Sequence, residues 1–170
     1  MFIIVMGVSG CGKSVVGSRL AERLGAHYAE GDEFHSKANI EKMRSGIPLD
    51  DDDRWPWLNA IAEAIDDWRT HDRDAMIACS ALKKAYRDIL GGGRDDVVFV
   101  HLEGSMDLIA SRMAKRQHEY MPATLLQSQF DTLEPPDEKA ENVITVDIAP
   151  EPETIVEIVL DRLRKRGMIA

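Results

Sequence analysis

The sequence predicts an α/β fold in which a parallel β-sheet carries helices on both faces. Apolar runs of strand length alternate along the chain with amphipathic stretches of helical length, which is typical of right-handed βαβ crossovers. Polar residues and glycines follow several of the apolar runs directly, at the positions where a parallel sheet gathers its ligands. No linker or internal repeat divides the 170 residues, so we expect one domain spanning 1–170.

The first half of the chain predicts three strands and three helices. Residues 2–6 are apolar throughout, as in a strand buried on both faces. The first helix follows to Leu24, with Gly25 as its C-terminal cap, and Ser36 caps a second helix. Acids favour a helix N-terminus, and one of the four acids at 50–53 is expected to cap the third. The remaining expected elements here are strands at 27–29 and 75–79 and helices ending near 44 and 68.

The second half continues the alternation. Expected strands are 97–102 and 142–146, and expected helices are 83–90, 105–116, 123–133 and 151–166. Met106 and Met113 lie on one side of their helix, which is typical of core packing. Pro56 is expected in the first turn of its helix, where proline is tolerated.

Charge and composition exclude several classes of function. The net charge of -9 disfavours nucleic acid and anionic membrane surfaces as partners. No apolar run reaches the length of a membrane span, and no secretory signal is recognisable, so a cytoplasmic location is expected. Cys11 and Cys79 make no disulfide framework. They follow strands expected to be neighbours, so oxidation could link them and block nucleotide binding; the alternative is that both are inert small residues.

A glycine-rich motif follows the first strand. Gly7-Val8-Ser9-Gly10-Cys11-Gly12-Lys13-Ser14 matches G-x-x-x-x-G-K-[ST], and it stands between an apolar run and an amphipathic helix. Its backbone N–H groups would bind the phosphates of ATP, Lys13 would reach the β- and γ-phosphates, and the Ser14 hydroxyl would hold Mg²⁺. The alternative is an ordinary glycine-rich turn. The motif and its flanks predict a P-loop kinase.

Transfer to a hydroxyl group also requires a carboxylate near the acceptor. Asp32, at the end of the second strand, is the candidate general base, although aspartate is also common in turns. Glu30 could orient Mg²⁺ through water or be a plain loop acid.

Several further motifs, in order along residues 7–136, resemble the gluconate kinase family. They are Asp32-Glu33-Phe34-His35, Asn39-Ile40-Glu41-Lys42-Met43, Gly46-Ile47-Pro48-Leu49, Asp51-Asp52-Asp53-Arg54, Pro56-Trp57-Leu58, Cys79-Ser80-Ala81-Leu82-Lys83-Lys84, Tyr86-Arg87-Asp88, Ser128-Gln129-Phe130 and Leu133-Glu134-Pro135. The resemblance implies ATP-dependent phosphorylation of D-gluconate at its 6-hydroxyl, giving 6-phosphogluconate and ADP. It also implies a five-stranded parallel sheet in the order 2-3-1-4-5 and a homodimer.

A sugar acid needs a cation for its carboxylate and mixed donors and acceptors for its hydroxyls. Candidates at the predicted strand ends are His35, Arg54, Ser80, Lys83 and Arg87. Taken singly, Arg54, Lys83 and Arg87 could each be an exposed helix residue, and His35 could be a loop histidine. Together with Asp32 they favour a binding pocket.

Residues 112–122 are expected to form a lid. Arg112 and Arg116 could close on the phosphates, Arg116 as a catalytic cation, or be solvated helix residues. The chain departs from the family here, because His118-Glu119-Tyr120 stands where Gly-His-Phe is usual. We therefore assign no role to His118. Glu30 also stands where the family usually has aspartate, which leaves the metal geometry open.

Two rival functions remain. Shikimate kinase needs a glycine triplet directly after the third strand, whereas Gly91-Gly92-Gly93 follows a helix here. A module that binds ATP without transferring phosphate is the rival from another class, and Asp32 together with a basic lid argues against it.

Overall fold

A computed structural model describes residues 1–115 and 123–170 and contains one five-stranded, all-parallel sheet. The strands are β1 (Phe2–Met6), β2 (His27–Glu30), β3 (Ala75–Ala78), β4 (Val97–Glu103) and β5 (Val143–Asp147). Their order is β2-β3-β1-β4-β5, which confirms the predicted topology.

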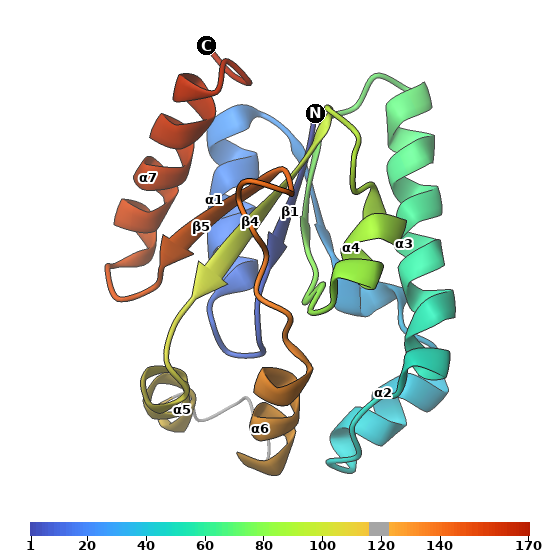
Figure 1. Cartoon of the computed structure of the whole chain (residues 1–170). Helices are drawn as coiled ribbons and strands as arrows, with labels where there is room; N and C mark the ends of the chain where they lie inside the picture. Colours follow the sequence, from blue (N-terminus) through green and yellow to red (C-terminus); the bar gives the residue numbers. More distant parts are fainter. Residues whose placement is uncertain (116–122) are drawn as a thin grey trace.

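The helices cover both faces of this sheet (Figure 1). On one face α1 (Lys13–Leu24) packs against α7 (Pro152–Lys165), and on the other α3 (Asp51–Thr70) packs against α4 (Lys84–Leu90). Three further helices, α2 (Lys37–Arg44), α5 (Met106–Ala114) and α6 (Ala123–Thr132), gather near the carboxyl ends of the strands (Figure 1). These helices and their loops therefore surround the edge of the sheet at which ligands of open α/β sheets bind.

The core is centred on β1, which pairs with β3 on one side and β4 on the other. All five β1 residues are buried, with Ile3, Ile4, Val5 and Met6 at 0% exposure. The apolar faces of α1, α3 and α7 close over the sheet through Leu20, Ile61 and Val159, among others. Because β1 is fixed on both sides, the loop that leaves its end starts from a rigid point.

Several helix ends follow the predicted chemistry. Gly25 caps α1 in the left-handed conformation, and the Ser36 side chain accepts a hydrogen bond from Asn39 N at the start of α2. Asp50 caps α3 in a reciprocal capping box with Asp53, so one of the four acids is the cap and three lie in the first turn. Such a cap is worth about 1 kcal/mol.

The structure corrects two details. Because α3 already begins at Asp51, Pro56 lies in its second turn and not the first. In addition, the chain after β2 forms a short 3₁₀ helix, η1 (Gly31–Phe34), which periodicity did not reveal. Among the described residues, no helix combines the length and apolar character needed to span a bilayer.

Candidate active site

The phosphate loop leaves β1 and enters α1 with the backbone that its glycines require. Gly7 has φ 141°, and a Cβ there would lie 2.8 Å from Cys11 Sγ and 2.9 Å from the Leu102 carbonyl oxygen. Gly12 has φ 99° at the helix N-cap. Both conformations are readily available only to glycine. The motif therefore has the strand–loop–helix setting of an anion cradle.

Side chains at this loop make internal contacts. Lys13 Nζ donates to the carbonyl oxygens of Gly7 and Val8, at 3.0 Å each. The amide oxygen of Gln129, from α6, accepts hydrogen bonds from Ser9 N at 3.0 Å and Ser9 Oγ at 3.2 Å. The loop is thus joined to a helix that lies 120 residues further along the chain.

Glu30 and Ser14 are connected through a residue that the sequence did not single out. The Tyr28 hydroxyl donates to the Glu30 carboxylate. Burial, followed by that hydrogen bond, raises the pKa of Tyr28, while a hydrogen bond with Ser14 lowers it. The Tyr28 hydroxyl therefore lies between the Glu30 carboxylate and Ser14 in the first turn of α1.

One cavity at the strand ends brings most of the predicted residues together. This strand-end cavity has a volume of about 110 Å³. Its lining residues are Ser9, Lys13, Asp32, His35, Met43, Pro48, Leu49, Arg54, Trp57, Ser80, Leu125, Ser128 and Gln129. Lys13 of the phosphate loop thus faces the same space as the candidate base Asp32.

The Asp32 carboxylate is available to a ligand. Its side chain is 84% exposed, and His35 Nε2 lies 3.9 Å from Asp32 Oδ1. Asn39 Nδ2 approaches His35 Nδ1 at 3.2 Å and also donates to the Asp53 carbonyl oxygen. Because Nδ2 is a donor, His35 Nδ1 is the acceptor and its neutral ring carries the proton on Nε2, toward Asp32.

His35 itself is fixed by its surroundings. Its ring stacks on Trp57 with 4.1 Å between the centroids, and Trp57 Nε1 donates to the Gly31 carbonyl oxygen at 2.7 Å. Burial lowers the pKa of His35, the Asp32 charge opposes that shift, and the Arg54 charge adds to it. The side chain is therefore a neutral donor in the cavity at pH 7.

Arg54 brings a cation to the cavity wall. It is 8% exposed, and its Nη1 donates to the Tyr86 hydroxyl at 3.0 Å. Tyr86 in turn donates to Asp51. The hydrogen bonds from Arg54 to Tyr86 and from Tyr86 to Asp51 thus fix the orientation of the Arg54 guanidinium.

Lys83 lies outside the cavity lining. Its Nζ pairs with Asp51 at 3.1 Å, and the hydrogen bond that Lys83 donates to Asp51 raises the pKa of Lys83. Asp51 also accepts a hydrogen bond from the Tyr86 hydroxyl, so Lys83 is linked to Arg54 indirectly, through Asp51 and Tyr86.

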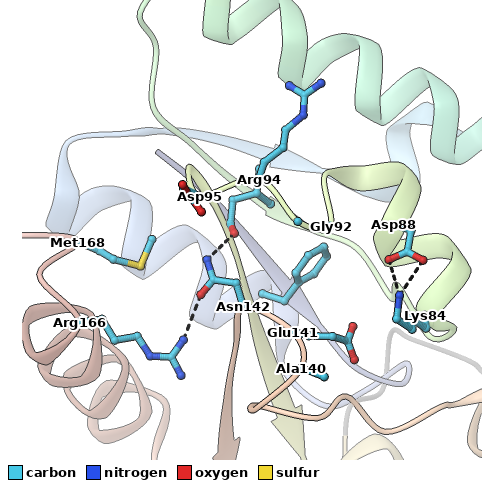
Figure 2. A pocket seen from close by; sticks show the side chains of 13 residues that line it. Lys84, Asp88, Gly92, Arg94, Asp95, Ala140, Glu141, Asn142, Arg166 and Met168 are labelled. Carbon is cyan, nitrogen blue, oxygen red and sulfur yellow. Dashed lines mark hydrogen bonds and ion pairs between the residues drawn. The ribbon is translucent and has the colours of Figure 1, made fainter.

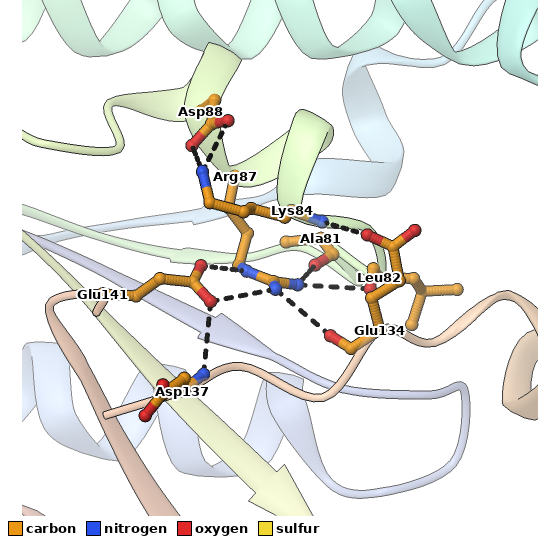
Figure 3. A network of polar contacts seen from close by, with 8 residues as sticks. All are labelled: Ala81, Leu82, Lys84, Arg87, Asp88, Glu134, Asp137 and Glu141. Carbon is orange, nitrogen blue, oxygen red and sulfur yellow. Dashed lines mark hydrogen bonds and ion pairs between the residues drawn. The ribbon is translucent and has the colours of Figure 1, made fainter. Parts of the chain in front are cut away.

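Arg87 is likewise absent from the cavity. It is 1% exposed, and its guanidinium pairs with Glu141 at 2.7 Å and with backbone carbonyls (Figure 3). With its donors occupied, it has none to offer a ligand, and we assign it a structural position rather than a place in the substrate site.

Arg112 lies beside a second cavity, on the other side of the phosphate loop. Its guanidinium donates to the carbonyl oxygens of Ile148 and Ala149, at 2.6 and 3.2 Å. This loop-side cavity, of about 290 Å³, is lined by loop residues 10–12, the start of α1, Arg112, Lys115 and residues 150–152 and 155. Arg116, His118 and the rest of 116–122, the greater part of the predicted lid, fall outside the described residues.

The most voluminous of these cavities, of about 590 Å³, lies elsewhere, near the amino ends of β4 and β5 (Figure 2). It contains the glycines 92 and 93 together with cations that already have partners: Lys84 pairs with Asp88, and Arg166 donates to Asn142. Gly91, at φ 124°, caps α4. The glycine triplet is therefore a helix end, remote from the position that a shikimate kinase would need.

The two cysteines are buried and unpaired. Burial raises the pKa of Cys79 to about 12 and also raises that of Cys11. Both thiols stay protonated at neutral pH, which favours the inert alternative over redox control.

Several parts of the site depend on contacts that the sequence does not reveal. Trp57 and Asn39 belong to motifs noted above, but those motifs do not reveal that both residues contact His35, and nothing local marks Tyr28. Gln129 and Ser128 belong to a motif noted above, but only the folded chain places α6 against the phosphate loop.

Comparisons with known proteins agree with this geometry. Residues 3–123 match a family model described as an AAA domain. The thermoresistant gluconokinase of Escherichia coli (strain K12) is 41% identical, and the match covers 95% of this chain and 93% of that protein. A crystal structure of a gluconokinase from Sinorhizobium meliloti 1021 superposes with a TM-score of 0.86 at 44% identity, covering 96% of this chain and 91% of the other. An unliganded sugar kinase from Janibacter sp. HTCC2649 superposes with a TM-score of 0.90 at 45% identity, covering 96% and 94%. By its motifs, its fold and its near full-length relatives, this chain belongs to the gluconokinase family of P-loop kinases.

Proposed function

We propose that this protein transfers the γ-phosphate of ATP to the 6-hydroxyl of D-gluconate, giving 6-phospho-D-gluconate and ADP. The observation that carries the proposal is the strand-end cavity, in which Lys13 of the phosphate loop faces Asp32, His35 and Arg54. A phosphate donor and a sugar acid can meet there, with the groups that each requires. The gluconokinases among the relatives support the choice of acceptor.

On the donor side, the backbone N–H groups of the phosphate loop bind the phosphates, and the Lys13 ammonium neutralises the γ-phosphate. For this, Lys13 leaves the carbonyl oxygens of Gly7 and Val8. The loop-side cavity beside Arg112 and residues 150–152 receives the nucleoside.

On the acceptor side, Asp32 accepts the proton of the 6-hydroxyl as that oxygen bonds to the γ-phosphorus and the bond to the β,γ-bridging oxygen breaks. The Arg54 fork binds the sugar-acid carboxylate. His35 Nε2–H and the Ser80 hydroxyl hydrogen-bond sugar hydroxyls. Arg116 remains part of the proposal as a cation for the transferring phosphoryl group.

Mg²⁺ fits the donors around the phosphate loop. The described residues contain no group of three or more His, Cys, Asp or Glu side chains that could hold a metal ion. Mg²⁺ bound with a nucleotide typically uses few protein ligands together with phosphates and waters. The Ser14 hydroxyl would hold it, with Glu30 behind Tyr28 ordering that region. The ion would neutralise charge on the β- and γ-phosphates.

The proposal also includes a cytoplasmic homodimer that binds neither nucleic acid nor membranes. The family resemblance supports the dimer, and the net charge of -9 supports the absence of polyanionic partners.

The test is ADP release measured with ATP, Mg²⁺ and a panel of acceptors: D-gluconate, other aldonic acids, shikimate and nucleoside monophosphates. We expect turnover stimulated most by gluconate, with phosphorus–proton NMR placing the new ester at C6. Stimulation by shikimate alone, or ATP binding with no acceptor-dependent turnover, would contradict the proposal.

A further inference from the structure

Arg87 is a buried cation outside the proposed substrate site, and every donor it has is used (Figure 3). Nε and Nη2 donate to the two Glu141 carboxylate oxygens at 2.7 and 3.2 Å. Nη1 donates to the carbonyl oxygens of Ala81 and Leu82 at 3.0 and 3.2 Å, and Nη2 donates to that of Glu134 at 3.1 Å. A planar fork with all its N–H groups satisfied is fixed in place, and lysine cannot reproduce that geometry.

What Nη1 holds is the turn between β3 and α4. Ala81 lies there in the left-handed region, with φ 44°, which residues with a Cβ seldom adopt. Its carbonyl oxygen and the next one both accept from the same nitrogen. The guanidinium therefore supports a turn that the local sequence does not favour.

This turn positions Ser80, which serves both halves of the site. The Ser80 side chain lines the strand-end cavity, while its carbonyl oxygen accepts from Gly7 N of the phosphate loop at 3.2 Å. A shift of the turn would move a wall of the cavity directly. It would reach the phosphate loop at Gly7, the first residue of the motif.

The opposite wall is joined to the same guanidinium. Glu134, just after α6, accepts from Arg87 through its carbonyl oxygen and donates its own N–H to the Leu82 carbonyl oxygen at 2.8 Å. Its carboxylate also accepts from Lys84 N at 3.1 Å. Since α6 contributes Ser128 and Gln129 to the cavity, Arg87 sets the spacing between two of its walls.

We propose that Arg87, braced by Glu141, is a positioning residue for the acceptor: it holds the β3–α4 turn and the end of α6 at the separation that admits the sugar acid. It does so without touching the substrate. The inference rests on the proposed function for its kinetic consequence, but not for its structural one.

Three variants test it. Arg87→Lys keeps the charge and loses the fork, and Glu141→Gln weakens the brace from outside the cavity. Glu138→Gln is the matched control, because Glu138 pairs with Arg162 at 3.2 Å in the same region without contacting the turn. Each is measured for the gluconate KM, for kcat, for the affinity for a non-hydrolysable ATP analogue and for amide hydrogen exchange without ligands.

We expect Arg87→Lys to raise the gluconate KM by about tenfold and Glu141→Gln by about threefold, because small displacements of a binding wall cost affinity steeply. Analogue affinity should change by less than about twofold in both variants, and Glu138→Gln should behave as wild type. Amide exchange should be faster at Gly7 and Glu134, whose N–H groups donate to Ser80 and Leu82 of the turn, in the first two variants only. If Arg87→Lys does not fold, Glu141→Gln still carries the comparison.

Two outcomes would overturn the inference. One is unchanged amide exchange at Gly7 and Glu134 in both variants. The other is a gluconate KM that matches the control while only the melting temperature falls, which would make Arg87 a stabilising residue alone. If wild type shows no gluconate-dependent turnover, the proposed function fails, and the exchange measurement still decides whether Arg87 holds the turn.

Discussion

The phosphate loop and the strand-end cavity meet at Lys13 but are built in opposite ways. The loop is one run of consecutive residues, 7–14, held between a central strand and the helix that follows it. The cavity draws its lining from separate segments between Ser9 and Gln129. A contiguous site takes its geometry from its own backbone, whereas a dispersed site takes it from distant contacts such as the Arg87 fork. Substitutions that damage the two halves should therefore separate in their kinetics.

The largest effect is expected from Lys13→Ala, which breaks the donor half. kcat should fall by about a thousandfold, because a cation aimed at the developing charge is lost. The melting temperature should stay near wild type, since the Lys13 ammonium hydrogen-bonds only two backbone carbonyl oxygens here. Lys139→Ala, at an exposed position, is the control. A rate near wild type would remove Lys13 from the mechanism.

Asp32→Asn should give the next largest effect, and it tests where the two halves meet. If Asp32 takes the proton, kcat should fall by about a hundredfold or more. Glu33→Gln changes the neighbouring exposed acid and should leave kcat unchanged. An Asp32→Asn effect confined to KM would instead make Asp32 a substrate-orienting group.

Arg54→Lys should affect the acceptor half alone. The loss of a bidentate fork should raise the gluconate KM by about tenfold while the ATP KM changes little. Arg73→Lys, at an exposed position just before β3, is the control. Equal increases in both KM values would mean that the two halves are not separable.

The smallest effect concerns pH. Burial lowers the pKa of His35, so the folded state resists protonation while the unfolded chain takes up a proton near pH 6.5. Unfolding free energy should therefore fall as pH drops below about 6.5. His35→Gln should reduce that slope in urea titrations, whereas substitution of the exposed His71 by Gln should not. The slope that remains belongs to the buried His101, whose pKa burial lowers to about 4. An unchanged slope in His35→Gln would contradict the burial argument.

The same contrast explains what could be predicted from sequence. The phosphate loop, the sheet order and the caps at Gly25 and Ser36 all depend on local patterns or on family motifs, and the structure confirms the order and both caps. Asp32, His35, Arg54 and Ser80 were expected near each other because strand ends converge, and they do line one cavity.

The residues placed differently depend on pairings that no local pattern encodes. An arginine in the middle of a short helix gives the same sequence pattern whether its side chain faces a ligand or Glu141, which lies 54 positions away. The apolar pattern of its helix does not reveal that the Trp57 ring stacks on His35 at the cavity. Composition also does not indicate that Lys83 forms an ion pair with Asp51 and lies outside the lining of the strand-end cavity.

The position of β1 has a consequence for synthesis. It precedes the other four strands of the sheet along the chain, yet its partners are β3, at Ala75–Ala78, and β4, at Val97–Glu103. A nascent chain that ends before Ala75 therefore presents an unpaired Phe-Ile-Ile-Val-Met strand with both hydrogen-bonding edges open, the pattern that promotes self-association. Fragments that stop before β3 should be insoluble even though they contain the whole phosphate-loop motif. The chain should therefore bind nucleotide only after most of its acceptor-binding segments have been translated.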